Sequence, residues 1–311
     1  MVSTMLHDLL KALLTSKHIE DEIKKHQLTG TVVLYSYWFN ASALATTLAK
    51  VNKTNIQRVT RVHGGDLYQD LHPHSYLSFR QVTAAGLDRI YPTSNLGAQV
   101  LQEILDTSLH SKIEVTRLGT RPPNRLPVKN QVDELVVVSC SSMKEIKRLH
   151  LIIESIALTG LPIRWIHFGD GPLREQLQAL AEKKLTGYRY EWKGAVTNQA
   201  LYDFYEHQYV DLFLNTSFSE GIPVSIMETQ SFGIPCVATN VGGNAEIISD
   251  RVGMLVSQVG NPVEIAEAIV HLLTLSPNEK EKMRSLARQN WDDHYNSSKN
   301  YATFSAKLLN L

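Results

Sequence analysis

Residues 209–228 read YVDLFLNTSFSEGIPVSIME, and they predict a strand, a loop of small residues and a helix. The apolar run at 209–214 has the length and composition of a buried parallel strand. Pro223 suits the first position of a helix, because its missing N–H would have no partner there. The backbone N–H groups of 221–225 would then lie at a helix N-terminus, which is a typical binding site for phosphate.

Two carboxylates accompany this loop: Glu220 lies within it, and Glu228 lies just beyond the first helical turn. Acidic side chains near a helix N-terminus can simply complement the helix dipole. A ligand with both phosphate and hydroxyl groups would instead use the amides for its phosphate and the carboxylates for its hydroxyls. A nucleotide sugar is such a ligand, so the pattern leaves a structural and a ligand-binding interpretation open.

The spacing of the two acids resembles a known signature. Glu220 and Glu228, with seven residues between them, resemble the E-x7-E pattern of retaining glycosyltransferases of family 4, which have the GT-B fold. The downstream segments SFGIPCVAT (231–239) and VGGNAE (241–246) are similar to the same family. The resemblance implies two Rossmann-like domains facing a cleft. It also implies transfer of a sugar from a nucleoside diphosphate sugar to a saccharide or lipid-linked acceptor, as in cell-surface polysaccharide synthesis.

The composition is that of an ordinary soluble protein of 311 residues, 43% hydrophobic and 20% charged. This length allows two domains of about 150 residues. Lys plus Arg equals Asp plus Glu at 31 each, so no charge excess indicates a nucleic-acid partner. Cys140 and Cys236 lie in apolar runs, as is typical of free thiols in a reducing compartment. Without a long apolar run or a secretory signal, we expect a cytoplasmic protein.

Strands alternate with helices along the chain, which predicts parallel sheets and an α/β fold. In the first half we expect strands at 31–38, 56–62, 89–93 and 113–117. In the second half we expect strands at 134–140, 163–168, 188–192, 209–214, 235–239 and 253–256. The second half is then a doubly wound domain, which binds its ligand at the carboxyl ends of its strands.

The domain boundaries follow from a proline-rich segment at 121–127, which we expect to be a linker. The first domain is then 1–121, on the acceptor side, and the second is 122–295, on the nucleotide-sugar side. The resemblance implies that 296–311 packs back on the first domain.

The resemblance also assigns a donor-binding set in the second domain. Gly169-Asp170-Gly171 follows a predicted strand and resembles the family's nucleotide-side loop, although such a turn is a weak signal alone. The nucleobase would lie against the backbone that ends at Gly194. The donor-binding set is therefore Glu228, Gly221, Ile222, Pro223, Val224, Gly169, Asp170, Gly171 and Gly194.

Lys147 is the candidate cation of the site. A Lys-Arg pair is usually two solvated charges, but Lys147 fits a family lysine that neutralises the leaving diphosphate. The family's arginine about six residues earlier is replaced here by Ser141-Ser142. Lys144 and Arg148 are the alternatives that could replace it.

The candidate catalytic residues are Glu220, Lys147 and His63. By resemblance, Glu220 holds sugar hydroxyls and Glu228 holds ribose hydroxyls. A lone histidine is more often structural, but His63 follows a predicted strand and precedes two glycines and Asp66. The resemblance suggests that His63 contacts the transferring sugar and that Asp66 lies on the acceptor side.

We expect no cofactor and no metal ion. No D-x-D motif follows a suitable strand, and the histidines, including His72-Pro73-His74, lack metal-ligand spacing. By resemblance to metal-independent GT-B enzymes, a helix dipole and a lysine would replace the cation.

The chain opens with a helix where the family usually has a strand and a glycine-rich loop, so we expect the N-terminal domain to be incomplete. An incomplete sheet has an unpaired edge, which favours self-association or a partner chain. The alternative function is therefore a non-catalytic or partner-dependent module that binds a nucleotide sugar. A GT-B epimerase or phosphorylase is a weaker alternative. The amphipathic helix at 3–26 could contact a membrane peripherally, although core packing explains such helices more often.

Overall fold

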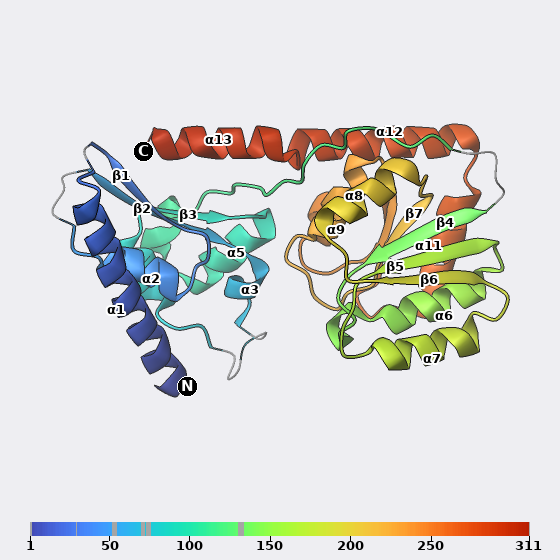
Figure 1. The fold of residues 1–311 in the computed structure, drawn as a ribbon, viewed down its shortest axis with the longest axis horizontal. Helices are drawn as coiled ribbons and strands as arrows, with labels where there is room; N and C mark the ends of the chain where they lie inside the picture. Colours follow the sequence, from blue (N-terminus) through green and yellow to red (C-terminus); the bar gives the residue numbers. More distant parts are fainter. Residues whose placement is uncertain are drawn as a thin grey trace. The chain divides into compact units, whose positions relative to one another are not determined.

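The structure, a computed structural model, describes residues 2–28, 30–51, 55–69, 72, 76–129 and 134–310. The chain folds into two compact units (Figure 1). The first comprises Met1–Arg117 and Ala302–Leu311, and the second comprises Leu118–Tyr301. Pro73 and His74, which we named in the histidine-rich segment, lie outside the described residues.

The first unit is built on a three-stranded parallel sheet of order β1-β2-β3. Its strands are β1 (Val32–Ser36), β2 (Ile56–Val62) and β3 (Arg89–Pro92). Its helices are α1 (Val2–Lys25), α2 (Ala41–Leu48), α3 (Gly64–Leu67), α4 (Arg80–Gly86), α5 (Asn95–Ile104) and the 3-10 helix η3 (Thr107–Lys112). The core contains Val62, Ile90 and Leu101, and Phe304 from the C-terminal segment packs with Val59 and Tyr91.

The strand expected at 113–117 is wrong. Ile113 forms a single bridge with Ile90, and the N–H groups of Glu114 and Thr116 donate to Ile90 and Pro92. Pro92 has no N–H with which to return a bond, so the ladder cannot continue past it. Residues 113–117 therefore run beside β3 without forming a strand.

The second unit is built on a six-stranded parallel sheet of order β6-β5-β4-β7-β8-β9. Its strands are β4 (Leu135–Cys140), β5 (Ile163–Phe168), β6 (Arg189–Gly194), β7 (Leu212–Asn215), β8 (Cys236–Thr239) and β9 (Gly253–Val256). Its helices are η4 (Glu145–Lys147), α6 (Leu149–Thr159), α7 (Arg174–Lys184), α8 (Asn198–His207), α9 (Val224–Ser231), α10 (Asn244–Ile247), α11 (Pro262–Thr274) and α12 (Pro277–His294), followed by α13 (Ser297–Leu309), which continues into the first unit.

Two hydrophobic cores cover the two faces of this sheet. Successive side chains of a strand point to opposite faces, so Val137 of β4 joins one core and Val138 joins the other. Helices α6 and α7 lie on one face and α8 and α9 on the other (Figure 1). The second unit is thus the doubly wound α/β domain that the sequence predicts.

The proline-rich segment at 121–127 lies within the second unit. The N–H of Asn124 donates to the carboxylate of Glu206 on α8, and Arg125 Nε donates to the carbonyl of the same residue. The chain passes between the units at Arg117–Leu118 and again at Tyr301–Ala302. None of the helices in the described ranges combines the length and apolar character needed to cross a membrane.

Candidate functional site

The sheet of the second unit contains a point where the chain changes direction. Strands β4 and β7 are neighbours, while β5 and β6 extend to one side and β8 and β9 to the other. In open parallel sheets, ligands bind at the carboxyl ends of the strands at such a point. The segments that follow β4 and β7 there are 141–148 and 216–223.

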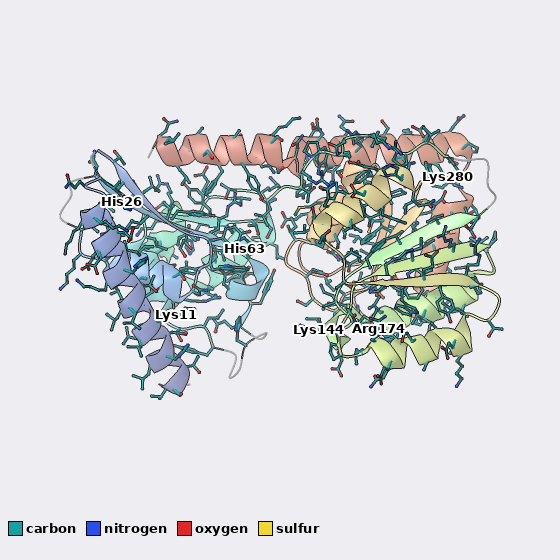
Figure 2. All side chains as sticks on the ribbon, in the orientation of Figure 1. Lys11, His26, His63, Lys144, Arg174 and Lys280 are labelled. Atoms are coloured by element: carbon teal, nitrogen blue, oxygen red, sulfur yellow. The ribbon has the colours of Figure 1, made fainter. Side chains whose placement is uncertain are left out.

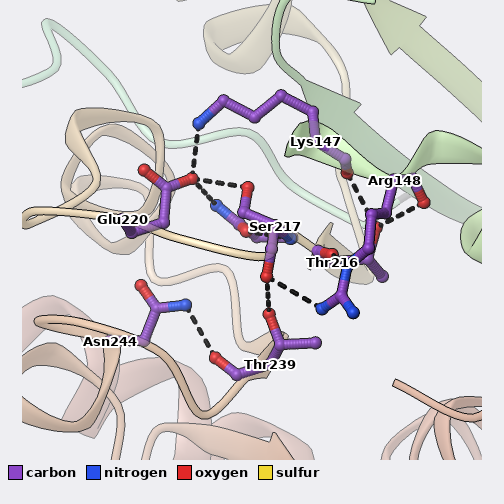
Figure 3. Close-up of polar contacts among 8 residues, drawn as sticks. Lys147, Arg148, Thr216, Ser217, Glu220, Thr239 and Asn244 are labelled. Carbon is purple, nitrogen blue, oxygen red and sulfur yellow. Dashed lines mark hydrogen bonds and ion pairs between the residues drawn. The ribbon is translucent and has the colours of Figure 1, made fainter. Parts of the chain in front are cut away.

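Lys147 and Glu220 meet at this point (Figure 3). Lys147 Nζ donates to Glu220 Oε1 at 2.6 Å. Glu220 Oε1 also accepts from Ser217 Oγ at 2.6 Å and from Asn215 Nδ2 at 3.3 Å. The lysine side chain is 23% exposed and the glutamate side chain 11%, so the pair is largely withdrawn from water but can still be reached by a ligand.

The sequence reasoning missed Asn215 and Ser217, although their positions carried a signal. Both are polar residues at or just after the carboxyl end of a buried strand. Such positions are enriched in ligand-binding and site-forming residues in parallel sheets. Here they hold the carboxylate of Glu220 in place independently of the lysine.

The helix that follows this loop presents free amides. Pro223 is the N-cap of α9, whereas we expected it to be the first residue of the helix, which is Val224. In the described part of the chain, no acceptor is assigned to the N–H groups of Gly221, Ile222, Val224 and Ser225. This helix N-terminus is therefore electropositive and available to an anion.

The loop after β8 presses against the same backbone. Gly242 has a φ of +51°, and a Cβ added there would lie 1.8 Å from the carbonyl oxygen of Glu220. The N–H of Gly243 donates to the carbonyl of Gly221 at 2.6 Å. Glycine at 242 thus permits the close approach that fixes Glu220 and Gly221.

Glu228 lies on α9 and is only 7% exposed. Asn198 on α8 donates from Nδ2 to Glu228 Oε1. Burial raises the pKa of Glu228 to about 7, although the Asn198 hydrogen bond and the charge of Arg121 act in the opposite direction. Among the described residues, Glu228 shares no hydrogen bond with the Lys147–Glu220 pair. Sequence reasoning missed Asn198 and Arg121, which lie far from Glu228 in the chain.

The predicted nucleotide-side loop packs beside the segment that follows β4. Gly169 has a φ of +137°, and a Cβ there would lie 1.8 Å from the carbonyl oxygen of Ser141. Its N–H donates to the carbonyl of Gly194 at 2.8 Å, which joins the ends of β5 and β6. Asp170 accepts from Arg174 at 2.6 Å, and a Cβ on Gly171 would meet the backbone of Met143. The structure therefore brings the three predicted glycines together near the switch point.

His63 lies in the first unit, at the carboxyl end of β2 (Figure 2). Its ring packs against Tyr37 and Trp38, with centroids 4.5 Å apart in each case. Both ring nitrogens are buried and have no hydrogen-bond partner among the described residues. Burial and the charge of Arg61 lower the pKa of His63 to about 4, so the ring is neutral at physiological pH.

Asp66 is 3% exposed and binds backbone of its own unit. Its two carboxylate oxygens accept the N–H groups of Phe39 and His63. Burial raises the pKa of Asp66 to about 6, and the hydrogen bonds oppose that shift. These contacts give Asp66 a structural role that the sequence did not reveal, while its acceptor-side role stays a prediction.

The chain is similar to one known protein family and to several known proteins. The family model described as glycosyl transferases group 1 matches residues 121–290. The putative colanic acid biosynthesis glycosyltransferase WcaL of Escherichia coli is 28% identical over 267 residues, which are 80% of this chain and 64% of that protein. The amylovoran biosynthesis glycosyltransferase AmsK of Erwinia amylovora is 25% identical over 250 residues, which are 75% of this chain and 59% of that protein. The chain thus spans less than two thirds of each of these two relatives.

Solved structures share the fold. A glycosyltransferase from Rickettsia africae superposes with a TM-score of 0.73 at 17% identity, and the match covers 96% of this chain and 80% of the Rickettsia chain. The apo form of the lipopolysaccharide outer core galactosyltransferase WaaB gives 0.74 at 18% identity, covering 96% and 81%. At these identities the similarity establishes the α/β GT-B architecture.

Proposed function

Because the chain belongs to the glycosyl transferases group 1 family, we propose that it transfers a sugar from a nucleoside diphosphate sugar to a saccharide or lipid-linked acceptor. The observation that carries this proposal is the Lys147–Glu220 pair at the sheet's switch point, beside the free amides of α9. The names of the relatives WcaL and AmsK refer to polysaccharide biosynthesis. A similar solved structure, HepE from Anabaena, is described in complex with UDP and glucose.

In this proposal, each part of the site binds one part of the donor. The amides of 221–225 and the ammonium of Lys147 bind the diphosphate, and the nucleobase lies near Gly194. Glu220 accepts hydroxyls of the sugar and Glu228 accepts those of the ribose. His63 contacts the transferring sugar, and Asp66 lies on the acceptor side. No metal ion or other cofactor is needed, because the lysine and the helix N-terminus supply the positive charge.

The contacts of Glu220 explain how the pair could serve a ligand. Lys147 is neutralised by Glu220 at 2.6 Å, so the ammonium is not left as an unpaired buried cation before a donor binds. Because Ser217 and Asn215 also hold the carboxylate, Glu220 keeps its position when the lysine turns toward a phosphate. As the bond to the sugar breaks, negative charge grows on the diphosphate, and Lys147 stabilises that charge.

Calorimetric titration with UDP-sugars and GDP-sugars tests the proposal. Wild type should bind one of these donors, and Lys147→Met should weaken binding about tenfold or more, since a hydrogen bond to a charged group is worth about 1.5–3 kcal/mol. Lys183→Met is the matched control, because Lys183 is an exposed lysine on α7. A folded wild-type protein that binds no donor would refute the proposal. Sugar transfer or donor hydrolysis then separates an enzyme from a binding module.

We also propose that the first unit contacts a partner chain. β1 lies at the edge of its sheet, and α1 exposes Leu6, Leu10 and Leu14 by 59–66%. Unpaired edges and exposed apolar stripes favour association. Sedimentation at increasing protein concentration tests self-association, and flotation with anionic vesicles tests the peripheral membrane contact that α1 would permit.

A further inference from the structure

Arg148 has an unusual backbone conformation next to the candidate site. It lies between η4 and α6 with φ 47° and ψ 42°, in the left-handed region. This region strains residues that carry a Cβ, and glycine is the residue that occupies it without cost. An arginine in this position therefore indicates that its side chain supplies an interaction that glycine could not.

The guanidinium of Arg148 donates four hydrogen bonds, all to main-chain carbonyls. Nε donates to Thr216 at 2.8 Å and Nη2 to Ser217 at 3.0 Å, in the loop after β7 (Figure 3). Nη1 donates to Val259 at 2.8 Å and Nη2 to Gln258 at 3.0 Å, in the loop after β9. The planar fork of arginine presents donors at this spacing, whereas the ammonium of lysine is a single point.

The loop after β7 also donates hydrogen bonds to the segment that carries Arg148. Thr216 Oγ1 donates to the carbonyls of Lys147 and Arg148 at 3.2 and 3.1 Å. The N–H of Phe218 donates to the carbonyl of Ile146 at 2.8 Å. The backbone around Lys147 is therefore tied to the backbone that leads into Glu220.

We propose that Arg148 is a positioning residue of the donor site. Its guanidinium holds the loops 216–218 and 257–260 against η4, and this sets the geometry of the Lys147–Glu220 pair. Four of its five N–H groups are taken by carbonyls, so it does not replace the second diphosphate cation that the sequence lacks. The inference rests on the proposed function for its kinetic consequence, but its structural part can be measured without a donor.

Arg148→Gly removes the guanidinium and its four hydrogen bonds but keeps the backbone conformation, because glycine adopts the left-handed region without strain. Without the four guanidinium hydrogen bonds, we expect kcat/KM to fall about 100-fold, as a misplacement of about 1 Å can cause. Methylguanidinium, added at millimolar concentration, should bind in the vacated space and restore part of the activity. Arg148→Lys should not restore it. Gln27→Gly is the matched control, since Gln27 is an exposed residue with a φ of 45° in the first unit.

Hydrogen exchange of the amides at 216–221 provides the readout that needs no donor. Exchange should be faster in Arg148→Gly than in wild type and should slow again with methylguanidinium. Unchanged exchange in Arg148→Gly overturns the inference whether or not a donor is known. If wild type binds no donor but exchange responds as expected, the proposed function fails, while the inference that Arg148 holds the two loops is supported. If exchange responds but donor turnover is unaffected, the positioning role is overturned. A loss of turnover that methylguanidinium does not relieve also overturns that role.

Discussion

Glu228 provides a direct test of how burial of a carboxyl group affects its ionisation and the stability of the second unit. Burial raises its pKa from 4.5 to about 7. One unit corresponds to about 1.36 kcal/mol, so ionised Glu228 lowers the stability of the folded state by about 3 kcal/mol. Glu228→Gln keeps an oxygen that can accept from Asn198 but cannot ionise. The variant should therefore be more stable than wild type wherever Glu228 is ionised.

The pH dependence follows from the direction of the shift. Between pH 4.5 and about 7 the folded state binds a proton that the unfolded state has lost, so the stability of wild type falls as pH rises through this window. The advantage of Glu228→Gln should thus be close to zero near pH 4 and reach about 3 kcal/mol near pH 8. Comparing the two proteins at each pH cancels the other titrating groups, such as Asp66.

Urea unfolding followed by tryptophan fluorescence measures this difference. Trp165, Trp192 and Trp291 lie in the second unit, so the signal mainly reports that unit. At about pH 8 the midpoint of Glu228→Gln should lie about 1.5 M urea above that of wild type, for a denaturant slope of about 2 kcal/mol per M. If the stability difference is the same near pH 4 and pH 8, Glu228 does not titrate as its burial requires.

Three further predictions concern particular residues. Gly242→Ala should distort the loop that contains Glu220 and weaken donor binding, because its Cβ would lie 1.8 Å from a main-chain oxygen. Gly187→Ala is the control: Gly187 has a φ of +86° and open space around it, so this change should lower the free energy of unfolding by only about 1 kcal/mol. Equal effects of the two changes on calorimetric binding and thermal unfolding would contradict this reasoning. Burial raises the pKa of Asp66 from 3.8 to about 6, so the stability of wild type relative to Asp66→Asn should fall as pH rises through this window, and a difference in thermal midpoint that does not change with pH would contradict this titration. Burial raises the pKa of Cys140 to about 12 and raises that of Cys236 as well, so neither thiol should react with a disulfide reagent near neutral pH until urea unfolds the protein, and rapid labelling of the native protein would count against this.

The sequence was most informative where structure depends on local pattern. Buried parallel strands are continuous apolar runs, and the strands predicted at 163–168 and 253–256 have the observed bounds. The segment 113–117 (IEVTR) is also rich in β-branched residues, but whether it forms a strand depends on Pro92, its partner on β3. Pairing of this kind is set by a neighbour that is distant in sequence, and composition does not show it.

The candidate site divides in the same way. Lys147 and Glu220 follow different strands, and the rule for parallel sheets brings such strand ends together once the strand order is known. The role of Arg148 has no comparable signal, because a Lys-Arg pair at a helix start is usually solvated. Its role depends on four carbonyls between 216 and 259, whose directions only the folded backbone defines.

The two buried acids, Asp66 and Glu228, show why a perturbed pKa alone does not identify a binding residue. Burial raises the pKa of both. In Asp66 each oxygen already accepts a backbone N–H, so a ligand hydroxyl would have to displace a bond that holds its own unit together. In Glu228 the described hydrogen bond uses Oε1 alone and comes from the side chain of Asn198, which can move more readily than backbone. A ligand hydroxyl can therefore displace the Asn198 amide from Glu228 at a lower cost than it can displace a backbone N–H from Asp66. This favours Glu228 over Asp66 as the acid that binds a ligand.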